Sequence, residues 1–286
     1  MLKFLTLCIS GVMLGCIYGL IALGYGLIYK ASGLMSFVQG DMLTLGAFLG
    51  LTYWLSLLLT MLCAFAFGML LEKGVIRRLL NKKVMPIYVV LATIAISYIL
   101  QNGSQLIWGT WTLNFPSVFK ASTVKLFGLL AVQPEVILCL ILSMVSMVVL
   151  HLFMNKTKLG TAMRASSMDS MAAESCGINV SLTTGITWGF SAMLAAMAGI
   201  LIGPMYGVYS SLGANLGNKG FAGAIAGGYG NMYGAIVGGI LLGIIEIFAK
   251  AYISTQLSDA IVFAVLIIVL IVKPAGLLGK IVPEKV

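Results

Sequence analysis

Long stretches without a charged residue constrain this chain more than any other feature of its sequence. Asp, Glu, Lys and Arg are absent from residues 4–29, 42–71, 84–119, 136–155, 175–218 and 220–245. Each stretch can hold at least one membrane-spanning helix of about 20 residues. A membrane barrel would instead need alternating segments of about 10 residues, which these continuous runs are not. The spans are therefore predicted to be helices, which satisfy their own backbone hydrogen bonds in lipid.

The composition agrees, because 60% hydrophobic and 9% charged residues leave too little polar surface for a water-soluble domain of 286 residues. We expect an all-α integral membrane protein, a polytopic bundle formed by residues 1–286 as one domain. The first apolar run is too long for the core of a signal peptide, so a retained helix is predicted. The five scattered cysteines and the single histidine, His151, predict neither disulfides nor a metal site. No GxSxG, HExxH or GxxxxGK[ST] motif is present, so no enzyme activity is expected.

Basic residues cluster in three segments, residues 72–83, 155–179 and 273–285. The positive-inside rule places all three at the cytoplasmic face. Threading the chain accordingly predicts eight full spans plus a short, broken, glycine-rich helix at residues 217–231. The N-terminus is then outside and the C-terminus cytoplasmic. We attribute the net charge of +9 to the excess of basic residues in these cytoplasmic segments, and we expect no nucleic-acid partner.

Glycines recur at every fourth position in three places, a spacing that lets helix backbones approach closely in lipid. These ladders are Gly11, Gly15, Gly19; Gly199, Gly203, Gly207; and Gly230, Gly234, Gly238. The first two share the pattern G-x3-G-x2-Y-G, and the predicted threading makes them run in opposite directions. This arrangement suits an inverted repeat, a common plan for transporters, although the abundance of glycine also produces such matches by chance.

Polar side chains at membrane depth are few and are candidates for function. The strongest lie in Gln39-Gly40-Asp41, where we predict a helix break with Asp41 capping a helix that restarts at Met42. Asp41 then lies beside a permeation path or serves only as an interfacial cap. Glu246 and Lys250 are predicted to form an i,i+4 ion pair that is structural. The other candidates are Asn102, Gln105, Asn215, Asn218, Lys219, Asn231 and Asp259.

The longest predicted cytoplasmic loop, residues 155–181, contains small and apolar residues that suit a short amphipathic helix ending at Gly177. This loop resembles the coupling loop of the permease subunits of ABC importers, which carries Glu-Ala-Ala and then a glycine four positions on. Here Met171-Ala172-Ala173 and Gly177 stand at those positions, with Met in place of the Glu. Three other stretches are similar to the branched-chain amino-acid branch of these permeases: LIALGYGLIYKASGLMSFVQGDMLTLGAF, KGFAGAIAGGYGNMYGAIVGGILLGIIE and VLIIVLIVKPAGLLGK.

The chain departs from that branch in two places. Gln39-Gly40-Asp41 stands where the branch usually has His-Gly-Glu, and the run from Leu51 to Leu71 is shorter than usual. The first departure puts the identity of the substrate in question.

The resemblance implies a permease in a bacterial or archaeal cytoplasmic membrane that imports branched-chain amino acids by alternating access. It also implies a second permease subunit, two cytoplasmic ATPases that bind the ATP, and an extracytoplasmic binding protein. No cofactor is expected in the chain itself. The predicted substrate-path residues are Gln39, Gly40, Asp41, Asn102, Lys219, Gly227 and Gly228. The predicted ATPase-coupling residues are Arg164, Met171, Ala172, Ala173, Glu174 and Gly177.

Two alternatives to this function stay open at the level of sequence. One is a permease of the same family for urea, short amides or a sugar. The other is a channel or ion-coupled carrier that works alone, which the coupling-loop pattern disfavours because such a protein needs no ATPase dock.

Overall fold

The computed structural model describes residues 2–50, 53–82, 84–114, 124–126 and 130–279. Its helices and strands, in chain order, are α1 (Leu2–Ser32), α2 (Val38–Leu49), α3 (Tyr53–Leu71), a π-helical turn (Glu72–Ile76), α4 (Arg77–Asn81), α5 (Pro86–Trp108), β1 (Val124–Leu126), β2 (Leu130–Val132), α6 (Pro134–Lys156), α7 (Lys158–Met168), α8 (Ser170–Ser175), α9 (Val180–Tyr206), α10 (Leu212–Gly227), α11 (Met232–Tyr252) and α12 (Ser258–Val272). The two short strands pair antiparallel.

Helices account for nearly all of the architecture, which confirms the predicted all-α polytopic class. Within the described ranges, six helices are long and apolar enough to cross a membrane: α1, α3 with its continuation to Asn81, α5, α6, α9 and α11. The other helices of the described ranges are shorter than the roughly 20 residues of a full span, and three of them have 12 residues or more. These are α2 with 12 residues, α10 with 16 and α12 with 15. Eight full spans were predicted, and the part of the chain that the structure describes has six helices of that length, with α2 and α12 too short to count as full spans.

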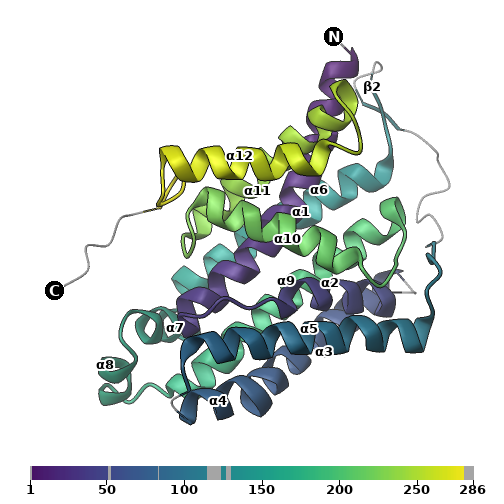
Figure 1. The fold of residues 1–286 in the computed structure, drawn as a ribbon. Coiled ribbons are helices and arrows are strands. Elements are labelled where there is room, and N and C mark those ends of the chain that lie inside the picture. The colour runs from purple at the N-terminus through teal and green to yellow at the C-terminus, as the bar shows by residue number, and fades with distance from the viewer. Residues whose placement is uncertain (1, 51–52, 83, 115–123, 127–129, 280–286) are drawn as a thin grey trace.

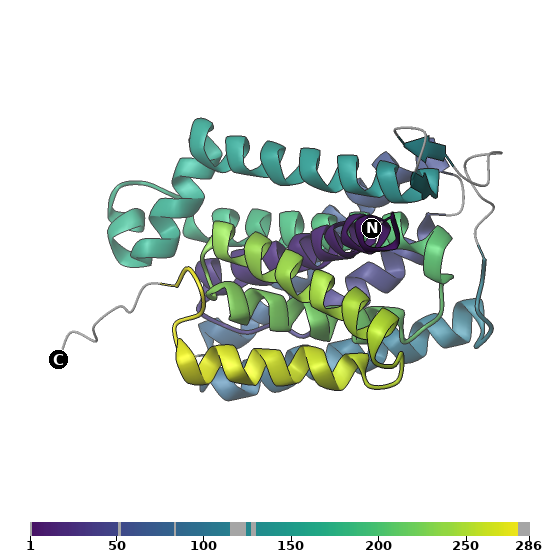
Figure 2. The ribbon, with the colours of Figure 1, turned by 90° about the horizontal axis from the view of Figure 1, so that it is seen from above.

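Helix α1 runs through the middle of the bundle, between α6 on one flank and α12 on the other (Figure 2). Between Met13 and Ile28 nearly every side chain is buried, including Tyr18 and Tyr25. By contrast, α5 and α6 expose leucine, isoleucine and valine side chains along their outer faces. A core of apolar residues inside an equally apolar outer surface is typical of a bundle that lies in lipid.

Glycines allow α1 and α11 to touch backbone to backbone. A Cβ atom built on Gly15 would lie 2.5 Å from Ile240 Cα, and one on Gly243 would lie 2.2 Å from Gly15 N. Gly11 and Gly19 also face α11, so the first predicted ladder lies along this contact. Gly199 of the second ladder meets the backbone of Leu43 in α2.

The other two ladders extend less far along their helices than predicted. Gly207 follows the end of α9 with φ of +71°, and Gly230 lies in the turn before α11 with φ of +86°. Both are therefore turn residues and not members of a helical ladder. Gly234 and Gly238 are helical and lie against the backbone of α10. The similar motifs at Gly11–Gly19 and Gly199–Gly207 thus end differently, the first inside a helix and the second at a helix end.

The helix break near the start of α2 lies upstream of the predicted position. Gly33, with φ of +68°, ends α1, and residues 34–37 run without regular structure until α2 begins at Val38. Gln39, Gly40 and Asp41 are inside α2, so the prediction that Asp41 caps a helix starting at Met42 is wrong. Glycine at position 40 has a different purpose: a Cβ there would lie 2.4 Å from Gly213 O in α10.

The three basic segments meet at one end of the bundle. Figure 1 shows α4, α7 and α8 at the end opposite the N-terminus and β2. Lys30, Arg164 and Pro274 line one cavity of about 1040 Å³ at this end, so the end of α12 lies there too. Helix α10 overlaps the glycine-rich segment predicted at 217–231 but begins earlier, at Leu212. It is preceded by Val208, which pairs with Leu113 beyond the end of α5, and followed by Tyr229 at the cavity.

Candidate functional site

A cavity of about 220 Å³ lies between α2, α5 and α10. Ser97, which lines it, is close to the middle of α5, so the cavity lies near mid-depth of the bundle. Two of the helices around it, α2 and α10, are short. Discontinuous helices that meet near the midplane are typical of the substrate sites of transporters. The lining residues are Tyr25, Phe37, Gly40, Asp41, Ile94, Ser97, Tyr98, Gln101, Gly213, Ala214, Gly217 and Asn218.

Glycines bring α2 and α10 into contact beside this cavity. Cβ atoms built on Gly213 and Gly217 would lie 1.9 Å from Gly40 O and 2.8 Å from Gly40 Cα. Thr44 Oγ1 also accepts a hydrogen bond of 2.9 Å from Gly213 N, which satisfies a backbone donor at the start of α10. No side chain separates the two backbones, so polar groups from both helices reach the same small space.

Asp41 is the acidic residue among the described residues of this cavity, and its side chain is 2% exposed. The Ser97 hydroxyl donates a hydrogen bond to Oδ2 of Asp41. Oδ1 has no hydrogen-bond partner among the residues that the structure describes. None of the ion pairs in that part of the chain includes Asp41. This carboxylate therefore retains an unused acceptor inside the bundle.

Gln39 lies two residues earlier but points away from this cavity. Its amide nitrogen donates to Ser191 O at 2.8 Å, and the Ser191 hydroxyl lies 2.7 Å from Gln39 Oε1. The same hydroxyl is 2.8 Å from Gly24 O. The Gln39 side chain therefore joins α2 to α9, and through the Ser191 hydroxyl to α1, with both its nitrogen and its oxygen in contact with Ser191.

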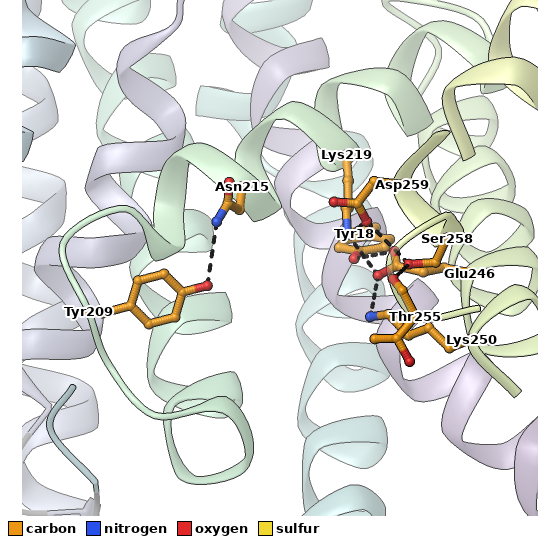
Figure 3. Close-up of polar contacts among 9 residues, drawn as sticks. All are labelled: Tyr18, Tyr209, Asn215, Lys219, Glu246, Lys250, Thr255, Ser258 and Asp259. Carbon is orange, nitrogen blue, oxygen red and sulfur yellow. Dashed lines mark hydrogen bonds and ion pairs between the residues drawn. The ribbon is translucent and has the colours of Figure 1, made fainter. Parts of the chain in front are cut away.

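Lys219 belongs to a cluster of charges separate from the cavity (Figure 3). Glu246 Oε1 accepts from Lys219 Nζ at 2.7 Å and from Lys250 Nζ at 2.6 Å, while Tyr18 donates to Oε2 at 2.6 Å. Lys219 also pairs with Asp259 at 2.7 Å. The predicted Glu246–Lys250 pair is thus present within a larger cluster. Two acids and two bases balance in charge and join α10, α11 and α12 to α1.

The remaining substrate-path candidates do not reach the cavity. Asn102 lies on the exposed side of α5 and donates to Tyr98 O at 2.7 Å. Gly227 packs on Gly234 O, and Gly228 lies against the backbone of Gly279. Of the seven predicted residues, Gly40 and Asp41 line the cavity and the other five lie elsewhere.

The predicted coupling loop contains two short helices, α7 and α8. Thr157 caps α7, Asp169 caps α8 and Asn179 caps α9, each through a side-chain oxygen 3.0 Å from a backbone nitrogen. Gly177, with φ of +80°, ends α8, and Ile178 N donates to Ala173 O at 3.0 Å. The predicted stop at Gly177 is therefore observed, but a turn at Asp169 divides the predicted single helix.

The coupling candidates differ in their exposure. Ala173 is buried at 4%, whereas Met171 is 80% exposed and Met168 beside it 86%. Ala172, Glu174 and Gly177 are exposed, and Arg164 donates to Asn155 Oδ1 at 2.9 Å. Large exposed methionine side chains on both α7 and α8 are suited to contact with an apolar partner.

A family model described as "Branched-chain amino acid transport system / permease component" matches residues 7–270, which include all the described helices but the start of α1 and the end of α12. The chain belongs to this permease family. The match confirms the family that the sequence motifs indicated.

Individual relatives of this permease agree with that assignment. It is 31% identical over 198 residues to the high-affinity branched-chain amino acid transport system permease protein LivH of Salmonella typhimurium. It is 32% identical over 198 residues to LivH of Escherichia coli and to the corresponding BraD of Pseudomonas aeruginosa. Each match covers 62% of this chain and 63% of the relative. No solved structure matches the chain.

Ser97, Gln101 and Tyr18 were not among the functional candidates from the sequence of this permease. Ser97 and Gln101 are spaced i,i+4 on a helix without charged residues, a signal that could have placed both on one face with Asp41. Tyr18 gave no such signal, because its partner Glu246 is 228 positions away. Among the residues described, no three His, Cys, Asp or Glu side chains lie together as a metal site requires.

Proposed function

We propose that this permease is the membrane subunit of an ATP-driven importer of branched-chain or related amino acids. The family match over residues 7–270 is the observation that supports this most strongly. The relatives' names describe permeases of high-affinity branched-chain amino acid transport systems. In the proposed importer, a second permease subunit completes the core, two cytoplasmic ATPases supply the energy and an extracytoplasmic protein delivers the substrate.

The proposed substrate path passes through the cavity at Gly40 and Asp41. Tyr98 is 63% exposed and Asn218 is exposed, so the cavity opens on the flank between α5 and α10. A second permease subunit against this flank would close the path on its open side. Small rotations or sliding of packed helices would then expose the cavity to one side of the membrane and then to the other.

In this proposal the ATPases bind at α7 and α8, which places that end of the bundle in the cytoplasm. The exposed Met168 and Met171 would enter a groove of the ATPase, and Ala173 would transmit its movement to the bundle. The positive-inside rule supports the same orientation, because Lys30, Arg164 and Lys273 lie at this end.

Uptake by a reconstituted importer tests the function. We expect proteoliposomes with this permease, its companion ATPases and binding protein to accumulate leucine, isoleucine or valine only with ATP on the side of the membrane where the ATPases lie. Binding of urea or a sugar by the binding protein, with no binding of leucine, would favour the alternative substrates. Uptake by the permease without any ATPase would support the channel or ion-coupled carrier and contradict the proposal.

Substitutions in the coupling helices should separate ATP hydrolysis from transport. Ala173→Trp places a large side chain at a buried contact of α8, and Gly177→Pro forces a residue with φ near −65° into a position with φ of +80°. We expect uptake to fall roughly tenfold or more while the ATPases still hydrolyse ATP, a loss of about 1.4 kcal/mol or more in coupling. Assays of both activities in the same proteoliposomes measure this.

Val145→Trp is a matched control, because it adds an equally large side chain at a 51% exposed position on the outer face of α6, outside the proposed dock. Its uptake should remain near that of the unmodified protein. Normal uptake in the Ala173→Trp and Gly177→Pro variants would remove the assignment of α7 and α8 as the ATPase dock.

A further inference from the structure

Asp41 combines three properties that are rarely found together in the interior of a membrane protein. It is 2% exposed, it lines a cavity, and one of its carboxylate oxygens has no hydrogen-bond partner among the described residues. A charge at membrane depth is costly unless it is paired, so such residues usually mark a path for a ligand or ion. The Ser97 hydroxyl compensates one oxygen only.

No basic side chain of the described chain fills the place beside Asp41. Lys219 is the nearest lysine along α10, next to the cavity residue Asn218, but its Nζ is held by Glu246 and Asp259. The charge-balanced cluster in Figure 3 therefore keeps this lysine away from Asp41. The cavity retains the negative charge of its carboxylate for a cation that comes from outside the chain.

The other walls of the cavity fit a small amphipathic cation. Gln101, Ser97 and Asn218 supply uncharged hydrogen-bonding groups, whereas Phe37 and Ile94 supply apolar surface. A hydrated metal ion would gain no favourable contact from the apolar walls. An amino acid with an aliphatic side chain uses both kinds of surface, with its ammonium group at the carboxylate.

We propose that the unpartnered oxygen of Asp41 binds the ammonium group of the substrate as it passes the cavity between α2, α5 and α10. The inference rests on the proposed transport of amino acids and specifies the chemistry that admits them. It predicts that an ammonium group is required at this point of the path and that a carboxylate alone does not suffice. Urea and sugars, which have no positive charge, would not satisfy Asp41.

Chemical labelling of the cavity tests this without ATPases or a binding protein. A single cysteine is introduced as Ala214→Cys, which lines the cavity, after the accessible Cys8, Cys63 and Cys176 have been changed to Ser. The purified chain reacts with a cationic aminoethyl or an anionic sulfonatoethyl methanethiosulfonate. Each rate is divided by the rate of the same reagent with a free thiol. We expect this ratio to be roughly tenfold or more higher for the cationic reagent, because a buried carboxylate attracts a cation strongly at a distance of a few Å.

Asp41→Asn, which keeps the shape and the Ser97 contact, should abolish this preference, and Asp41→Glu should keep it. Asn215→Cys on the exposed side of α10 is the matched control and should show no dependence on Asp41. Thermal unfolding shows whether both chains are folded. If they are, an equal preference for the cationic reagent before and after the Asp41→Asn change would overturn the proposal.

Protection by analogues of leucine identifies the ligand. We expect 3-methylbutylamine, which has the ammonium group, to slow the labelling of Ala214→Cys, and 4-methylpentanoate, which has only the carboxylate, to have no effect. Protection by the acid and not by the amine would contradict the proposal. Protection by Na⁺ over K⁺ at constant ionic strength, with no effect of the amine, would show an inorganic-cation site and would also overturn it.

The outcome is separable from that of the proposed function. Labelling reports on the cavity alone, whereas ATP-driven uptake reports on the whole importer. Amine protection without amino-acid uptake would leave the ammonium site in place and remove the function. Leucine uptake that is unchanged in Asp41→Asn would support the proposed function and remove the ammonium site.

Discussion

Gly243→Ala is expected to disrupt the bundle severely, although it adds a single methyl group. The added carbon would lie 2.2 Å from Gly15 N and 2.3 Å from Gly15 Cα, both backbone atoms of the central helix. A side chain can rotate out of such a clash, but a backbone that is buried on all sides cannot. Overpacking costs about 1–3 kcal/mol where side chains adjust, and we expect at least the upper end of that range here. Heating followed by size-exclusion chromatography in detergent measures the remaining folded protein.

Gly103→Ala on α5 is the matched control for this substitution. A Cβ atom there meets nothing within 4 Å, so stability should be unchanged or slightly higher because alanine favours a helix. Equal stability of the Gly243→Ala variant and the unmodified protein would show that α1 and α11 are not in the close contact described.

Lys219→Met is expected to be the second strongly destabilising change. The lysine and glutamate side chains are 9% and 1% exposed, so methionine leaves Glu246 with Tyr18 and Lys250 as its remaining partners. Removal of one partner from a buried ion pair typically costs about 3–5 kcal/mol. Because Lys250 still compensates part of the charge, we expect about 3 kcal/mol, measured by denaturant unfolding of the purified chain.

The double variant Lys219→Met, Glu246→Gln should recover a large part of this loss, because it removes the charge that was left unpaired. Lys158→Met on exposed α7 is the matched control and should have little effect. A stable Lys219→Met chain with impaired amino-acid uptake would instead return Lys219 to the substrate path, where the sequence had placed it.

Sequence patterns within one segment predicted where the helices lie. They did not predict which residues of different helices come into contact. The absence of charge over long runs identifies spans, because lipid excludes charge whatever the packing. The pair Glu246–Lys250 could be predicted because both residues are one turn apart on one helix. Lys219 and Tyr18 could not be assigned to the same cluster, because nothing in their own neighbourhoods indicates which helices will pack against them.

The position of the helix break shows why glycine is ambiguous in a sequence. Gly33 follows Ser32 and Gly40 precedes Asp41, so each glycine has a polar neighbour and either could interrupt a helix. Gly33 adopts a positive φ and ends α1, whereas Gly40 is helical and allows α10 to approach. The sequence could identify Asp41 as unusual, but its surroundings depend on Ser97 and Asn218, which come from two other helices.

The glycine contact between α2 and α10 has a mechanical consequence. Where side chains from two helices interdigitate, the helices can slide past each other only by moving from one packing arrangement to the next. At Gly40, Gly213 and Gly217 the two backbones touch without glycine side chains, so the contact surface is smooth. We expect small sliding movements of the two helices to change the width of the space beside Asp41, with the hydrogen bond between Thr44 and Gly213 as the side-chain contact that must adjust.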